Sequence, residues 1–152
     1  MLSIRLICVG RLREKHYIEA CREYEKRLSG LCRLDIIEVP EEPERPDSLA
    51  RESVRVLEAI PQGSHVVALC IEGRQLDSPA LAQYISSRAA QGMSRLCLII
   101  GGSHGLADSV KAQAQLKLSM SLMTFPHHLA RVMVLEQVYR ALAINSGSKY
   151  HK

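Results

Sequence analysis

The stretch LCLIIGGSHGLADSV, residues 96–110, joins an apolar run directly to three glycines within five residues. Glycines behind a buried strand are typical of a loop in which the backbone approaches something too closely for a side chain. The approached group is a nucleotide, another piece of the chain, or nothing beyond a sharp turn. This stretch alone does not show which of these three explanations is right, so the rest of the sequence has to be considered.

Length and composition predict one globular domain that spans residues 1–152. A chain of 152 residues is long enough to bury one substantial core. Hydrophobic residues make up 47% of it and charged residues 24%, which is ordinary for a globular protein. No apolar run reaches the roughly 20 residues that span a bilayer. The first apolar run reads as a strand and not as a signal peptide, so we expect a cytoplasmic protein without membrane association.

Charge and side-chain chemistry narrow the classes of partner. A net charge of +4 permits an anionic partner but is weaker than that of a dedicated nucleic-acid-binding arm. One Phe, five Tyr and no Trp argue against a platform for stacking single-stranded bases. Five cysteines without a C-x-x-C pair predict free, buried thiols in a reducing compartment.

Apolar runs alternate with amphipathic segments along the whole chain. The apolar runs predict strands of a parallel sheet covered on both faces, at residues 2–9, 34–39, 65–71, 95–100 and 116–125. Periodic patterns predict helices between or after them, at residues 14–30, 47–60, 78–92 and 128–144. This alternation indicates the α/β fold class.

Two of the segments between the strands have distinctive patterns. The helix after Asp47 is expected to turn Leu49, Val54, Leu57 and Ile60 to the core. The acidic, proline-rich linker before it, PEEPERPD at residues 40–47, predicts a mobile surface loop.

The last helix carries apolar residues around well over half of its circumference. One sheet face cannot cover all of them, so the pattern favours a homodimer over a helix buried in its own domain. The residues concerned are Leu129, Val132, Met133, Leu135, Val138, Tyr139 and Leu142.

Common nucleotide, nucleophile and metal motifs do not account for the glycines. The order I-G-G-S-H-G does not match the dinucleotide pattern G-x-G-x-x-G, and no Lys-Ser or Lys-Thr pair follows to make a P-loop. Ser103 and His104 lie outside any G-x-S-x-G elbow, which argues against a hydrolase. No metal-binding spacing of His or Cys occurs, and His127 and His128 would face opposite ways on a helix, so we expect no metal.

Three motifs occur together in the C-terminal half: IIGGSHGL at 99–106, SLMTFPHHLARVMVLEQVYRA at 121–141, and the terminal KYHK at 149–152. In this order and in a chain of this size they resemble the RlmH family of SPOUT-superfamily methyltransferases, which modify a pseudouridine of large-subunit ribosomal RNA. The resemblance covers essentially the whole chain. It implies a parallel-sheet α/β domain of the SPOUT type with a C-terminal trefoil knot, an exception to the rule that chains do not thread their own loops.

The resemblance also implies a binding site for S-adenosylmethionine. Bare peptide can hold adenine through backbone groups while apolar side chains cover its faces, as a cofactor pocket requires. On this interpretation the glycines make room for the cofactor and for the knotted chain beside it. The implied cofactor-binding residues are Leu69, Gly101, Gly102, Gly105, Ser121, Leu122, Met123, Thr124, Phe125 and Pro126.

The candidate catalytic residues for this reaction lie in the last helix and the tail. Methyl transfer from a sulfonium to a ring nitrogen needs alignment and removal of a proton, without a metal or a covalent intermediate. A nearby cation would favour the pseudouridine anion, and the candidates are Arg131, Arg140, Tyr150 and His151, of which Arg131 and His151 are preferred. A solvated helix face or a dimer ion pair is the alternative role of each arginine. His127 is a candidate for orienting the cofactor or a phosphate.

The predicted function is therefore S-adenosylmethionine-dependent methylation of pseudouridine N3 in 23S ribosomal RNA. A short chain has little surface for reading sequence, so recognition is expected to depend on the dimer and the assembled ribosome. Two alternatives stay open: a cofactor-free RNA-binding or ribosome-associated dimer, and a methyltransferase of the same superfamily that acts on transfer RNA.

Overall fold

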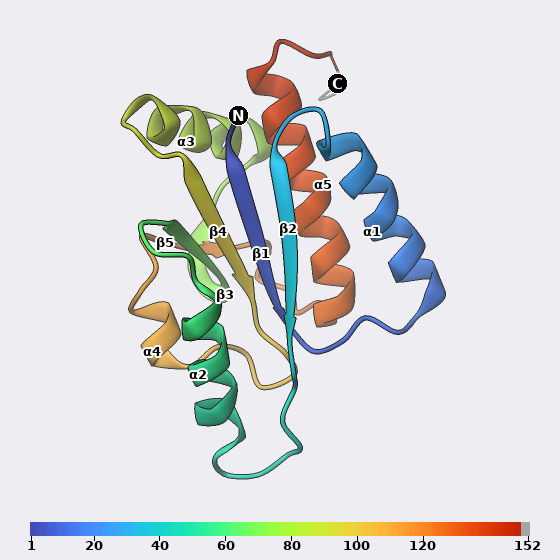
Figure 1. Ribbon diagram of the computed structural model, residues 1–152, viewed down its shortest axis with the longest axis vertical. Coiled ribbons are helices and arrows are strands. Elements are labelled where there is room, and N and C mark those ends of the chain that lie inside the picture. The colour runs from blue at the N-terminus through green and yellow to red at the C-terminus, as the bar shows by residue number, and fades with distance from the viewer. Residues whose placement is uncertain (150–152) are drawn as a thin grey trace.

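A computed structural model describes residues 1–149 and shows an entirely parallel five-stranded sheet. Its strand order is β2-β1-β4-β3-β5, so the chain moves in both directions from β1 as the sheet is built (Figure 1). The strands are β1 (Ser3–Val9), β2 (Arg33–Val39), β3 (His65–Gln75), β4 (Arg95–Ile100) and β5 (Leu116–Ser119). The predicted α/β class and parallel sheet are thus confirmed.

Helices cover both faces of this sheet. Three of them, α1, α3 and α5, contribute buried side chains to one core cluster, and the two shorter helices α2 and α4 contribute to the other (Figure 1). They are α1 (Lys15–Leu28), α2 (Ser48–Ala59), α3 (Ser78–Ala90), α4 (Asp108–Lys111) and α5 (His127–Asn145). No helix within residues 1–149 is long and apolar enough to cross a lipid bilayer.

The central strands have apolar side chains on both faces because each face is covered. In β1, Leu6 belongs to the cluster under α5, whereas Ile7 belongs to the cluster under α2, and both are 0% exposed. In β4, Leu98 and Ile99 are divided between the clusters in the same way. Successive side chains of a strand point to opposite faces, so an unbroken apolar run is what a doubly covered strand requires.

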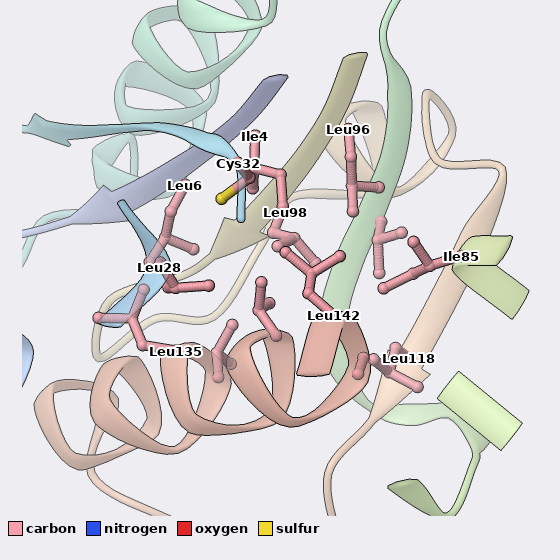
Figure 2. Close-up of a cluster of buried hydrophobic side chains, with 14 of the residues drawn as sticks. Ile4, Leu6, Leu28, Cys32, Ile85, Leu96, Leu98, Leu118, Leu135 and Leu142 are labelled. Atoms are coloured by element: carbon pink, nitrogen blue, oxygen red, sulfur yellow. The ribbon is translucent and has the colours of Figure 1, made fainter. Parts of the chain in front are cut away.

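The larger cluster joins the sheet to α5. Figure 2 shows Leu6 and Leu98 from the sheet facing Leu135 and Leu142 from the helix. Leu135 is only 1% exposed, and full burial of one such side chain contributes about 1.5–3 kcal/mol. This packing holds α5 against the sheet and thereby sets the position of the segment that precedes the helix.

The fifth strand is shorter than its apolar pattern suggested. We predicted a strand through residue 125, but β5 ends at Ser119. The Ser119 hydroxyl donates to the Ser121 carbonyl at 3.0 Å, and the Ser121 hydroxyl accepts from the Met123 backbone N at 3.0 Å. Local side-chain hydrogen bonds of this kind compete with strand pairing and turn the chain.

Of the predicted core face of α2, Leu57 and Ile60 pack against the second cluster, but Val54 is 54% exposed, so the prediction was wrong for that residue. The helix instead buries Ser48, Glu52 and Val56. Glu52 accepts a hydrogen bond from the Glu42 backbone N at 2.9 Å, and Ser48 accepts one from the Arg45 backbone N at 2.8 Å. The 40–47 linker that we expected to be a free surface loop is therefore fastened to the polar face of α2.

Glycine is required where β3 and β5 come together irregularly. Their register shifts between Leu69 and Arg74, and a Cβ on Gly73 would lie 2.7 Å from the carbonyl carbon and oxygen of Lys117. We expect Gly73→Ala to lower the free energy of unfolding by about 1–3 kcal/mol through overpacking. Denaturant unfolding measures this, with Gly30→Ala as the control, because no atom lies within 4 Å of a Cβ at Gly30. Equal stabilities of the two variants would contradict the prediction.

Candidate cofactor-binding site

A cavity of about 810 Å³ opens beside the carboxyl ends of β4 and β5 and the irregular second half of β3. Ligands of parallel α/β sheets bind in the crevice outside the strand ends, and this volume lies in the range of small-molecule sites. Its walls come mainly from residues 69–72, 100–106, 118–121 and 123–127. These segments are far apart in sequence and meet because the strands they follow are close together in the sheet.

The cavity brings together almost the whole set of residues proposed to bind the cofactor. Leu122 is the exception: it is 77% exposed and does not form part of the wall, although its neighbour Met123, at 75% exposed, does. Those in the wall are Leu69, Gly101, Gly102, Gly105, Ser121, Met123, Thr124, Phe125 and Pro126. These residues line part of the pocket with bare peptide and apolar side chains.

The glycines allow segments of the chain itself to approach one another closely. A Cβ on Gly101 would lie 2.5 Å from the carbonyl carbon and oxygen of Gly105, and Gly105 adopts a φ of +73° that favours glycine. The Gly105 backbone N donates to the Gly102 carbonyl at 3.0 Å, closing a tight turn. The glycine loop, residues 101–105, is thus compact, and it presents backbone to the cavity.

His127 lies at the junction of the cavity and α5. Its ring forms part of the wall, and its Nε2 is buried without a hydrogen-bond partner among the described residues. Burial lowers the pKa of His127, and neighbouring His128 lowers it further, so the imidazole is neutral at pH 7. The ring centroids of these histidines are 4.1 Å apart.

The predicted opposite orientation of the two histidines was therefore wrong. Both residues stand in the first turn of α5, and their Nε2 atoms converge beside Gly10, at 3.6 and 3.9 Å from where its Cβ would be. The His128 Nδ1 also lies 3.2 Å from a Glu14 carboxylate oxygen. Within residues 1–149 no group of three or more His, Cys, Asp and Glu side chains is placed to hold a metal ion.

Arg131 is not placed to contact a ligand in this cavity. It is 4% exposed, lies outside the wall, and donates to the Glu38 carboxylate at 2.8 Å and to the Gly10 carbonyl at 3.2 Å. Burial alone would raise the pKa of Glu38, but hydrogen bonds from the Leu12 backbone N and from Arg131 outweigh it and lower that pKa. The guanidinium joins α5 to the carboxyl ends of β1 and β2, which is a structural position.

The other predicted catalytic residues also lie away from the cavity wall or beyond the described chain. Arg140 donates to Glu136 one turn earlier on α5, at 2.7 and 3.0 Å. Tyr150 and His151 fall outside the described residues.

Sequence reasoning missed an ion pair at the edge of the cavity. Lys111 of α4 and Glu72 of β3 both belong to the wall, and the ammonium and carboxylate are 2.5 Å apart. They are 39 residues apart in sequence, so no local motif connects them. The one signal in the sequence that could have placed Lys111 at the cavity is its position a few residues after the glycine loop.

Comparison with known proteins identifies the family of this chain. A family model described as "Predicted SPOUT methyltransferase" matches residues 2–151. The chain belongs to the SPOUT methyltransferase family. Two curated relatives are each named "Ribosomal RNA large subunit methyltransferase H", one from Clostridioides difficile (strain 630) and one from Streptococcus equi subsp. zooepidemicus (strain MGCS10565). Each is 42% identical to this SPOUT family member, over 99% of this chain and 100% of the relative.

Two solved structures share the fold of this SPOUT family member. A probable methylase family protein from Haemophilus influenzae Rd KW20 matches with a TM-score of 0.60 and 14% identity, over 100% of this chain and 72% of its own. A probable methyltransferase from Bordetella pertussis Tohama I matches with a TM-score of 0.62 and 14% identity, over 93% of this chain and 96% of its own. At this identity the likeness concerns the fold alone.

The buried ion pair of Arg131 leads to a prediction about stability. Arg131→Met removes hydrogen bonds to a charged partner and should lower the free energy of unfolding by about 2–3 kcal/mol. Arg51→Met is the control, because Arg51 forms an ion pair with Asp47 in which both side chains are more than half exposed, and such pairs contribute roughly 0.5 kcal/mol or less. Denaturant unfolding compares the two variants, and similar losses would contradict a structural role for Arg131.

The low pKa of His127 predicts a pH dependence of stability. The unfolded state binds a proton at the usual pKa of 6.5, whereas the folded state resists protonation. Stability contributed by neutral His127 is therefore complete above pH 6.5 and falls below it. His128 and Arg131 also oppose protonation, while Glu41 and Glu14 favour it.

Unfolding experiments between pH 8 and pH 5 test this dependence. His127→Asn should weaken the fall in stability below pH 6.5, whereas the same replacement at exposed His16 should leave it unchanged. An identical pH profile for His127→Asn and the original protein would refute the assignment.

Proposed function

We propose that this protein is an S-adenosylmethionine-dependent methyltransferase that modifies N3 of a pseudouridine in 23S ribosomal RNA of the assembled ribosome. The observation that carries the proposal is the cavity, because it gathers every residue of the expected cofactor set except Leu122. Membership of the SPOUT family and the name shared by the curated relatives support the reaction and the RNA substrate.

The cavity fits the cofactor in size and in chemistry. The glycine loop offers backbone N–H and C=O groups to an adenine edge, and Leu69, Met123 and Phe125 offer apolar surface to its faces. Lys111 and Glu72 provide one positive and one negative group at the wall, which suits the carboxylate and ammonium of a methionine moiety. When bound, the cofactor supplies an electrophilic methyl group on a sulfonium.

The chain contributes alignment and shielding from water to this reaction. Rigid walls that hold donor and acceptor in line account for much of the rate of a bimolecular transfer. The neutral ring of His127 stays our candidate for orienting a ligand, and Tyr150 and His151 stay candidates for assisting proton removal from the base. Arg131 and Arg140 lie outside the cavity wall, so we assign neither of them contact with the reacting atoms in the same protomer.

Homodimerisation and the trefoil knot belong to the same proposal. Part of the apolar surface of α5, including Val132 and Met133, is only partly buried in one protomer, which supports a second copy packing there. Family membership supports the knotted C-terminal segment.

Titration with S-adenosylhomocysteine tests the cofactor site. We expect binding in the micromolar range, about fivefold weaker for Met123→Ala because a ligand in the cavity loses roughly 1 kcal/mol of apolar contact. Leu122→Ala is the matched control, since it is equally exposed but outside the wall, and should bind within about twofold of the original protein. No binding at millimolar ligand would overturn the proposed function in favour of a cofactor-free RNA-binding dimer.

Mass mapping of RNA after incubation with S-adenosylmethionine tests the substrate. Unmodified ribosomes should gain one methyl group on a 23S pseudouridine, and protein-free 23S RNA should react much less. Methylation of transfer RNA in preference to ribosomes would replace the proposed substrate with the transfer-RNA alternative.

A further inference from the structure

A carboxylate from the linker between β2 and α2 reaches the tip of the glycine loop. One oxygen of Glu41, Oε1, accepts hydrogen bonds from the Ser103 backbone N at 3.1 Å and from the Ser103 hydroxyl at 2.7 Å. The missing Cβ of Gly102 would lie 2.9 Å from the same oxygen. Glycine at position 102 is therefore what lets the carboxylate approach this part of the backbone.

The second oxygen of Glu41 faces two other segments. Oε2 lies 3.3 Å from the place where a Cβ of Gly10 would be, and the Nε2 of His127 lies 3.6 Å from that same place. Glu41 thus stands where the end of β1, the glycine loop and the start of α5 meet. The hydrogen bond from the Ser103 hydroxyl is the main cause that lowers the pKa of Glu41, and His127 and His104 add to it. The carboxylate is therefore ionised at neutral pH.

The linker holds Glu41 in place from its other side. Glu42 forms an ion pair with Arg55 of α2 at 2.6 Å, and its backbone N donates to buried Glu52 at 2.9 Å. A fixed acceptor loses little conformational entropy when it makes its hydrogen bonds. Glu41 is accordingly a preorganised anchor. Its side chain is exposed, as is that of Glu44 in the same linker, so the two differ in their hydrogen bonds and not in their burial.

A glycine-rich loop has more conformations to lose than any other kind of segment. Among the described residues, Glu41 supplies the only side-chain hydrogen bonds to the glycine loop. Ser103 belongs to the cavity wall, whereas Glu41 does not. Glu41 can therefore act on a ligand in the cavity through Ser103 and the backbone beside it, and electrostatically through His127, which is also part of the wall.

We propose that Glu41 is a positioning residue that holds the glycine loop in its cofactor-binding conformation through Ser103. This inference rests on the proposed function, because it concerns the same cavity. Without the anchor, the loop occupies its binding conformation for a smaller fraction of the time, and the apparent dissociation constant rises by the inverse of that fraction.

Binding of S-adenosylhomocysteine to a set of variants tests the inference. We expect the dissociation constant to rise about tenfold or more in Glu41→Ala, and roughly three- to fivefold in Glu41→Gln, which keeps an acceptor but no charge. Ser103→Ala keeps the backbone donor and should show roughly a threefold rise. Glu44→Ala, in the same linker and, among the described residues, without a hydrogen bond or ion pair to the loop, is the matched control and should bind within about twofold of the original protein.

Two further measurements separate positioning from a general structural role. The double variant Glu41→Ala/Ser103→Ala should bind no more weakly than Glu41→Ala alone, because both replacements remove one interaction. In turnover assays with ribosomes, KM for S-adenosylmethionine should rise in Glu41→Ala while kcat at saturating cofactor stays within about twofold. Amide hydrogen exchange of residues 101–106 without ligand should become faster in Glu41→Ala than in Glu44→Ala.

The outcomes distinguish this inference from the proposed function. If the original protein binds S-adenosylhomocysteine and Glu41→Ala binds it equally well, the inference is overturned and the proposed function stands. If Glu41→Ala lowers thermal stability without changing cofactor affinity or loop exchange, Glu41 is structural only and the inference again fails. Absence of binding by the original protein overturns the proposed function and, with it, the cofactor role of Glu41. Glu41→Gln and Ser103→Ala keep the test decisive if Glu41→Ala does not fold.

Discussion

Burial of the central strands on both faces is the constraint on which the rest of this structure depends. Leu6 and Ile7, consecutive in β1, are both 0% exposed because helices cover the sheet on each side. No polar side chain of a doubly buried strand can reach a ligand, so chemistry has to be placed in the segments that follow the strand ends. The cavity, the glycine loop and the anchoring carboxylates all occupy that edge of the sheet.

Two glutamates that follow one another closely at the end of β2 organise this edge. Glu38 accepts hydrogen bonds from Arg131 of α5 and from the Leu12 backbone N, both at 2.8 Å. Glu41, three residues later, accepts both hydrogen bonds from Ser103. One carboxylate therefore holds the final helix and the other holds the glycine loop. Hydrogen bonds to charged groups are among the stronger ones in proteins, and here they connect segments that the sheet alone only brings near one another.

The sequence predicted the scaffold well because its signal is local. A short apolar run such as residues 95–100, followed at once by glycines, is typical of a covered strand, and the structure places β4 there. The linker and the buried face of α2 were harder to predict from the sequence, because polar contacts between distant residues determine them. Val54 looked like a core residue by its spacing, yet Ser48 and Glu52 are buried in its place to meet the linker backbone.

In the candidate site, too, the local segments were predictable, whereas the long-range contacts between them were not. The resemblance located the peptide segments of the cavity, but it could not tell that Met123 lies in the wall and Leu122 outside it, since both stand in one short turn. Nor could it tell that Arg131 is buried against Glu38, because the two residues are 93 apart in sequence. The contact of Glu41 with the glycine loop could not be predicted, because Glu41 belongs to an acidic linker whose composition is typical of mobile loops.

Gly102 explains why an anion can stand so close to an apolar pocket without entering it. The residue lies in the cavity wall, while the place of its missing Cβ is already approached by Glu41 from outside the wall. A side chain there would push the carboxylate away and break the hydrogen bonds that fix Ser103. Without a partner such as the Lys111 that pairs with Glu72, a carboxylate on the loop side of the pocket would have to be desolvated when a ligand arrives. Kept behind bare backbone, Glu41 keeps its charge, and the cavity keeps an uncharged loop surface for the ring of a nucleoside.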